Sequence, residues 1–216
     1  SGGTETLRAS PRSPEVTLEG ERSLAQVSAT YLMLGVEHIL LGIDHLFFVT
    51  ALLFLVTGWK RLLGTVTAFT LAHSITLAGA SLGFLSAPPA FIEALIALSI
   101  VVVAAEVVLK NRGRTGIAVE RPWLIAFGFG LLHGFGFAGA LSDIGLPANA
   151  VPAALLFFNV GVEVGQILFI CVLLAADWAV LRMLPSSDKV WRRVIPVLIG
   201  IMAGFWTVER TLSIWA

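Results

Sequence analysis

The sequence contains little charge and almost no cysteine. Charged residues fill only 13% of the 216 positions, and the formal net charge is zero. This balance gives no basic surface of the kind that binds nucleic acid. Cys171 is the single cysteine, so the chain has neither a disulfide framework nor a cluster of thiolate ligands. Hydrophobic residues make up 57% of the chain, and its mean hydropathy of +0.91 excludes an ordinary soluble domain.

The first 22 residues differ from the rest of the chain. They are polar, include Pro11 and Pro14, and show no cleavable signal pattern. We expect residues 1–22 to form an outward-facing tail. The tail is either the remnant of a longer soluble region or, at its Ser-Gly-Gly start, a cloning scar. Residues 23–216 are then the transmembrane metal-binding domain.

Long apolar runs follow the tail. About 20 apolar residues cross a bilayer, so these runs predict an all-α, polytopic transmembrane helix bundle of about six spans. The first run exceeds one crossing, so it contains either an extra interfacial helix or one strongly tilted helix. The approximate bounds are Leu24–Gly58, Leu62–Phe84, Pro89–Leu109, Trp123–Leu141, Ala150–Leu181 and Val190–Ile214.

The loops between the spans alternate in charge. The second loop has no charged residue and the fourth has only Asp143, whereas the first, third and fifth are basic. By the positive-inside rule the basic loops are cytoplasmic, which places both termini outside. The basic residues are Lys60, Arg61, Lys110, Arg112, Arg114, Arg121, Arg182, Lys189, Arg192 and Arg193.

All four histidines lie inside these apolar runs. A polar side chain in hydrocarbon is costly and usually faces an interior cavity or pathway. Imidazole and carboxylate groups are also ligands of transition metals. At about 1.5 Å per helical residue, His45, His73, His133 and Glu163 fall near the bilayer midplane. The pattern therefore predicts a buried metal site on four helices.

A second tier is expected nearer the outer surface. Glu37 and His38 lie seven residues before Asp44 and His45, which stacks each pair on one helix face two turns apart. Glu37 and Glu93 are predicted to form an entrance for a cation. The alternative is a polar network that joins helices through hydrogen bonds. The full predicted metal set is His38, Asp44, His45, His73, His133 and Glu163.

Three segments resemble the HupE/UreJ family of membrane proteins. They are Gly35–Phe48, with the pattern of a histidine, five residues and Asp-His, then Phe69–Leu77 and Phe129–Gly136. The family is regarded as nickel or cobalt permeases with hydrogenase and urease accessory functions. The resemblance begins at about Tyr31. It implies metal handling by His38, Asp44 and His45, joined through their motif positions by His73, Glu93 and His133.

One departure identifies the branch of the family that this chain resembles. The fourth span contains only His133, without a second histidine or a following glutamate. The sequence is thus more similar to the second, broader branch, whose members often carry an outward soluble domain before the membrane part. The resemblance implies the bacterial inner (cytoplasmic) membrane. It also implies accessory or metalloenzyme-maturation proteins as partners, besides the metal ion and the lipid bilayer.

Three functions remain open from the sequence. The first is transport of a divalent transition-metal cation, nickel-like; because ligand imidazoles must be neutral, binding should weaken as the pH falls through about 6.5. The second is a zinc-dependent intramembrane hydrolase, with Asp44 or Glu163 as general base and Ser74 orienting substrate. For Ser74 a hydrogen bond between helices is the simpler alternative. The third is a non-catalytic metal sensor or assembly partner. Nickel and zinc both remain candidates.

Overall fold

The computed structural model describes residues 23–144, 147, 150–183 and 188–215, so the predicted tail 1–22 lies outside the described residues. All regular structure in the described part is helical, which confirms the predicted all-α class. The described helices are α1 (Leu24–Leu41), α2 (Ile43–Leu55), α3 (Trp59–Ser81), α4 (Pro89–Asn111), α5 (Ile117–Glu120), α6 (Pro122–Ile144), α7 (Val151–Met183) and α8 (Asp188–Ser213).

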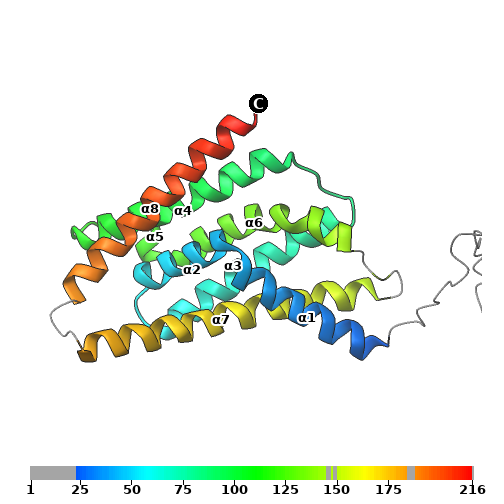
Figure 1. Cartoon of the computed structure of the whole chain (residues 1–216), viewed down its shortest axis with the longest axis horizontal. Helices are drawn as coiled ribbons and strands as arrows, with labels where there is room; N and C mark the ends of the chain where they lie inside the picture. Colours follow the sequence, from blue (N-terminus) through cyan, green and yellow to red (C-terminus); the bar gives the residue numbers. More distant parts are fainter. Residues whose placement is uncertain (1–22, 145–146, 148–149, 184–187, 216) are drawn as a thin grey trace, which may run out of the picture.

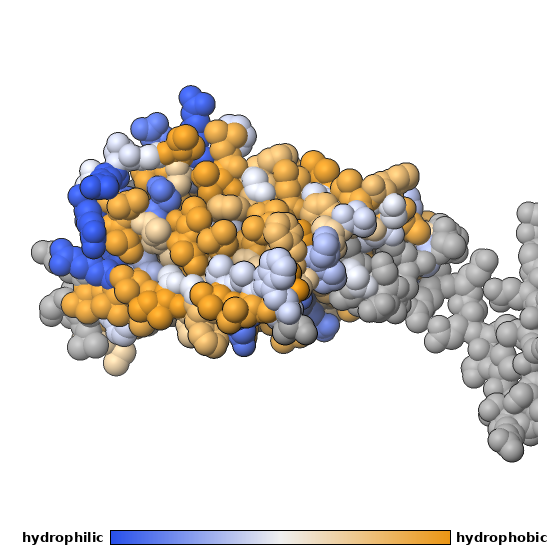
Figure 2. Space-filling view, turned by 90° about the horizontal axis from the view of Figure 1, so that it is seen from above, coloured by the Kyte–Doolittle hydropathy of each residue, from blue (hydrophilic) through white to orange (hydrophobic). Residues whose placement is uncertain are grey.

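The lengths and the apolar composition of the helices indicate a membrane bundle. Among the described residues, five helices are long and apolar enough to cross a membrane: α1, α3, α4, α7 and the Val190–Ser213 part of α8. Two shorter apolar helices, Ile43–Leu55 and Pro122–Phe137, lie among them. Many large hydrophobic side chains are exposed, and hydrophobic residues cover much of the face seen in Figure 2, as expected where lipid is the solvent.

The first apolar run is broken in two at Gly42. Gly42 has φ −79° and ψ 95°, which is extended rather than helical, and its N–H donates to the carbonyl of His38 at 3.0 Å. α2 then begins with Asp44 in its first turn, where the helix dipole favours a carboxylate. α1 and α2 together run from one end of the bundle to the other (Figure 1). The first run is thus two helices rather than the single tilted helix that was one of its two expected forms.

Contacts between helices fix their directions. Gly35 and Gly165 set α1 parallel to α7, because Gly35 packs on Phe158 and Gly161 while Gly165 packs on Ile39. Asn111 at the end of α4 donates to the carbonyl of Arg192 near the start of α8, so these two helices are antiparallel. Successive passes alternate, and α1 begins at the end of the bundle where α8 finishes (Figure 1).

The end of the bundle opposite to the start of α1 and the end of α8 is basic. The arginines of the loops and helix ends there are exposed, and hydrophilic residues gather at this end in Figure 2. A pocket of about 310 Å³ opens between the end of α2, the start of α3 and helices α4, α7 and α8. Lys110 lines it and donates to the carbonyls of Phe54 and Leu55, at 3.1 and 2.7 Å, and to the hydroxyl of Thr57 at 3.2 Å. This end is therefore held together by paired polar groups.

Two hydrophobic clusters lie on either side of the histidines. The first contains Phe48 and Phe69, and the second contains Ile39 and Phe158. His45 and His133 contact the phenylalanines of the first cluster, whereas His38 contacts Phe158 of the second. The histidines are thus located where the two cores meet.

Candidate metal centre

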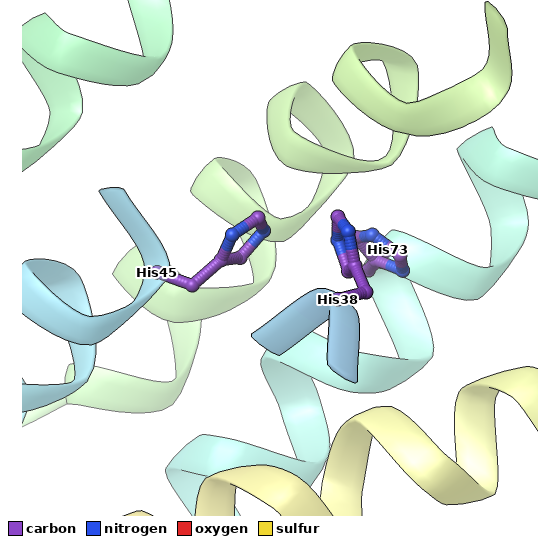
Figure 3. A group of neighbouring side chains, drawn as sticks. All are labelled: His38, His45 and His73. Atoms are coloured by element: carbon purple, nitrogen blue, oxygen red, sulfur yellow. The ribbon is translucent and has the colours of Figure 1, made fainter. Parts of the chain in front are cut away.

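Three histidines converge inside the bundle from three helices. His38 comes from the last turn of α1, His45 from the first turn of α2, and His73 from α3. Each offers one ring nitrogen, and these nitrogens all lie within 4.8 Å of one another. The ring centroids are 4.6 Å apart for His38 and His45, 5.9 Å for His38 and His73, and 6.4 Å for His45 and His73. Figure 3 shows the three rings turned toward a common point.

The helix break at Gly42 brings the first two rings together. In one continuous helix, residues seven apart are separated by about 10 Å along the axis. Here the His38 and His45 ring centroids are only 4.6 Å apart. The ring of His38 therefore lies beside that of His45, and not two helical turns from it as an unbroken helix would place it. His38 belongs to the central group.

His133 lies beside this group on α6. Its ring centroid is 5.1 Å from that of His45 and 5.0 Å from that of Phe69, and the side chain is buried. Its nitrogens are not part of the group of mutually close ligand atoms that His38, His45 and His73 form. The predicted four-helix site is thus brought together around three histidines, with His133 adjacent.

Hydrogen bonds orient two of the rings. The Asn159 amide donates to the carbonyl of Leu155 at 2.8 Å, which leaves its oxygen facing Nδ1 of His73 at 3.3 Å. Nδ1 of His133 lies 2.9 Å from the carbonyl of Phe129. Because a carbonyl oxygen can only accept, Nδ1 carries the proton in both rings and Nε2 presents its lone pair. Ligand histidines in metal sites usually have such a partner.

Five of the remaining ring nitrogens have no partner. Nε2 of each of the four histidines and Nδ1 of His45 are buried and form no hydrogen bond with the described residues. Buried polar atoms are normally paired, and leaving one unpaired costs about 1–3 kcal/mol. The three histidines of the group thus hold unpaired nitrogens close to one another, as the ligands of one metal ion are held. His73 does join α3 to α7 through Asn159, as the alternative of a polar network expects, but these five atoms take no part in such a network among the described residues.

The predicted carboxylates lie around the histidine group rather than in it. Asp44 pairs with Arg210 of α8 at 3.0 Å, and Glu163 of α7 accepts from the hydroxyl of Thr67 at 2.6 Å. Among the described residues, neither carboxylate joins the three-nitrogen group. The proposed entrance residues Glu37 and Glu93 are exposed.

Ser74 is occupied elsewhere. Its hydroxyl donates to the carbonyl of Thr70 in its own helix at 2.7 Å. This bond is neither the substrate contact predicted for a hydrolase nor the alternative bond between helices.

A run of polar pairs joins α3 and α7. It begins at His73 and Asn159 and continues with Thr70, whose hydroxyl donates to Gln166 at 3.0 Å. The Thr67–Glu163 hydrogen bond completes it. Thr70 and Thr67 precede His73 in α3, so the pairs lie on the side of the site that faces the basic end. The sequence showed the spacing of Asn159, Glu163 and Gln166 on one face, but not their partners.

Arg210 was missed. The signal available in the sequence was a charged residue inside the sixth apolar run, which in a membrane segment usually has a specific partner. That partner, Asp44, lies 166 positions away and became visible only in the fold.

Small residues allow α6 to approach the site. A side chain at Gly134 would collide with the carbonyl of His73 and the hydroxyl of Thr76. A side chain at Gly130 would likewise collide with the carbonyl of Phe69. Close helix contact through glycine is typical of membrane bundles. These glycines therefore serve packing, and packing is what brings His133 up to the group.

A family model matches residues 15–210 and is described as HupE / UreJ protein. The chain belongs to this family. The HupE / UreJ family is linked to nickel or cobalt uptake or to accessory functions, and the three-histidine group is compatible with that link. No curated protein and no solved structure gives a match.

Proposed function

We propose that this HupE / UreJ protein transports a divalent transition-metal cation across the membrane, with a nickel-like ion as its substrate. The observation that carries the proposal is the group formed by His38, His45 and His73, whose Nε2 atoms are buried and unpaired. Neutral imidazole suits borderline divalent ions such as nickel, cobalt and zinc. Hydrogen bonds from Nδ1 hold the ring of His73, and of the neighbouring His133, ready to bind.

A transported ion also needs a polar route on each side of its binding site. The polar pairs between α3 and α7 supply oxygen atoms on the side of the site that faces the basic end, and they include the carboxylate of Glu163. A carboxylate inside a membrane bundle favours a cation beside it. Toward the other end, Glu37 and Glu93 are exposed and available to collect the ion. These groups support a path through the histidine group.

The proposed location is the bacterial cytoplasmic membrane, with the basic loops inside and both termini outside. The charge of the loops supports this orientation. Single cysteines introduced at positions 112 and 145 test it in intact cells. Outside reagent should label position 145 and not position 112; the reverse pattern would contradict the orientation.

Uptake into proteoliposomes tests the function. Purified protein should take up Ni²⁺ or Co²⁺ down a gradient, and His73→Ala should abolish both uptake and metal binding. Glu163→Gln should keep the metal at the histidine group but slow uptake, because Glu163 is bonded to Thr67 and lies outside that group. Binding without any uptake by the unaltered protein would overturn the transport proposal.

One observation favours a second candidate, the zinc-dependent hydrolase. Three histidines with an open coordination position are the ligand set of several catalytic zinc sites. Such an enzyme also needs a base that reaches the zinc-bound water. Asp44 is paired with Arg210, and Glu163 is bonded to Thr67. The hydrolase is thus less well supported, and stoichiometric zinc that resists chelation, together with no uptake, would favour it.

A further inference from the structure

Arg210 reaches from the last helix to the edge of the histidine group. Its Nη2 lies 3.0 Å from Oδ2 of Asp44, the residue directly before His45. Its Nη1 donates to the carbonyl of Glu93 at the start of α4, at 3.2 Å. The side chains of Arg210 and Asp44 are only 22% and 24% exposed. One guanidinium thus joins α8, α2 and α4 beside the proposed ion site.

Only one of the two carboxylate oxygens of Asp44 takes part in this ion pair. Its Oδ1 is buried and has no hydrogen-bond partner among the described residues, although a carboxylate can accept several hydrogen bonds. Asp44 also directly precedes His45 in the first turn of α2. The free carboxylate oxygen therefore belongs to the chain neighbour of the ring whose two nitrogens are both unpaired. A buried carboxylate oxygen without a partner is costly unless a cation or a donor reaches it.

We infer that Arg210 is a tethered counter-cation that competes with the metal ion for Asp44. Without metal, the guanidinium neutralises the carboxylate and keeps the site from carrying an isolated negative charge in the membrane. When the divalent ion reaches the histidines, its charge replaces that of Arg210 at Asp44. This inference rests on the proposed function, and it assigns a role to a residue outside the histidine motifs.

The surroundings of Arg210 supply a place for the displaced side chain. Its guanidinium carbon already lies 5.7 Å from the ring centroid of Trp206, one turn earlier in α8, and Trp206 packs against Phe47 of α2. A guanidinium over an indole ring retains part of its stabilisation after leaving a carboxylate. Glu209, its exposed neighbour, and Glu93 are the other acids nearby. Arg210 can then return to Asp44 and help the ion to leave.

A double-mutant cycle on metal affinity tests the competition. Co²⁺ alone is titrated into purified protein in detergent, for the unaltered chain, Arg210→Gln, Asp44→Asn and the double variant. Arg210→Gln should tighten binding roughly tenfold, within the coupling expected for residues in contact. Asp44→Asn should weaken binding. When Asp44→Asn is already present, adding Arg210→Gln should have no further effect, because the competitor has lost its target.

The opposite pattern would overturn the inference. Equal tightening with and without Asp44→Asn, or weaker binding in Arg210→Gln, would mean that Arg210 does not compete with the ion for Asp44. If Arg210→Gln cannot be purified, Arg210→Lys decides. It keeps the charge but loses the fork that contacts Asp44 and Glu93 together, so it should tighten binding by a smaller factor. Unchanged or weaker binding in the lysine variant would refute the competition.

Uptake separates this inference from the proposed function. Arg210→Gln proteoliposomes should show a lower KM for Co²⁺ together with a lower maximal rate, because the ion is held longer. If Asp44 and Arg210 are coupled in binding but the unaltered protein takes up no Co²⁺, the inference stands and the transport proposal fails. A protein that binds no Co²⁺ overturns both.

Discussion

The histidine group and the basic end of the bundle differ in whether their polar atoms have hydrogen-bond partners. At the basic end, Lys110 donates to three oxygen atoms at the end of α2. Arg61 likewise donates to the carbonyls of Val119 and Glu120 in α5. At the histidines, hydrogen bonds orient the rings of His73 and the neighbouring His133, yet Nε2 of each of the four histidines has no partner.

This difference separates polar groups that stabilise the fold from polar groups that bind a ligand. The basic end is the more exposed of the two regions, since Arg61 is exposed and Lys110 is only partly buried, yet its polar groups are paired. Paired groups, such as those of Lys110, close helix ends and stabilise the fold. Unpaired groups that converge must gain their stabilisation from something that binds. The difference can be tested by breaking each region in turn.

The largest effect is expected from removing a central histidine. His45→Ala should lower Co²⁺ affinity by more than about 100-fold, beyond the 10- to 100-fold typical for a supporting residue of a metal site. His45 has both ring nitrogens unpaired, so it has no other evident role. Titration of the purified protein measures the loss.

His133→Ala is the matched control for this prediction. Its ring is equally buried but lies outside the group of mutually close nitrogens, so its removal should weaken binding less. If His133→Ala lost as much affinity as His45→Ala, the ion site would lie nearer α6 than the structure indicates.

Adding one methyl group at Gly42 should have the next largest effect. A Cβ there would lie 2.6 Å from Nδ1 of His45 and 2.8 Å from the carbonyl of His38. Gly42→Ala must therefore move one ring or the helix end, and Co²⁺ binding should fall by roughly 10-fold or more, since misplaced ligands lose affinity.

Gly64→Ala provides the control, because a Cβ at Gly64 in α3 meets no atom within 4 Å. It should leave binding unchanged. Unchanged binding in Gly42→Ala as well would show that the break at Gly42 does not position the histidines.

The sequence predicted the parts of this site but not their arrangement. Apolar run lengths and the four histidines were enough for a helical membrane bundle with a candidate metal site. Depth counted along a continuous helix separated His38 from His45, because nothing local marks Gly42 as a break rather than a packing glycine. Arg210 could not be assigned to Asp44, since contacts between distant helices depend on the whole fold.

The predicted role of Glu163 shows the same limit. Its depth in α7 agreed with that of the histidines, which made it a candidate ligand. Depth fixes one coordinate only, however, and the rotation of α7 directs Glu163 to Thr67 while Asn159 faces His73. Side-chain direction around a helix depends on packing that the sequence pattern did not resolve.

A smaller effect is expected from the residue that orients His73. Asn159→Leu removes the acceptor of the His73 Nδ1 proton and should cost about 10- to 100-fold in Co²⁺ affinity. Asn159→Asp keeps an acceptor at the same position and should retain more of the affinity. The comparison of the two Kd values separates loss of orientation from loss of packing. Equal losses in both variants would contradict an orienting role.

The smallest effect on metal binding is expected at the basic end, where the comparison predicts stability without function. Lys110→Met keeps a long apolar stem but leaves the carbonyls of Phe54 and Leu55 without their donor. Hydrogen bonds from a charged group contribute about 2 kcal/mol, so the Tm should fall while the Kd for Co²⁺ stays the same. Arg114→Gln, at an exposed position of the same end, should change neither quantity. A Lys110→Met protein with an unchanged Tm and a weakened Kd would mean that the basic end takes part in holding the ion, and the division between the two regions would not hold.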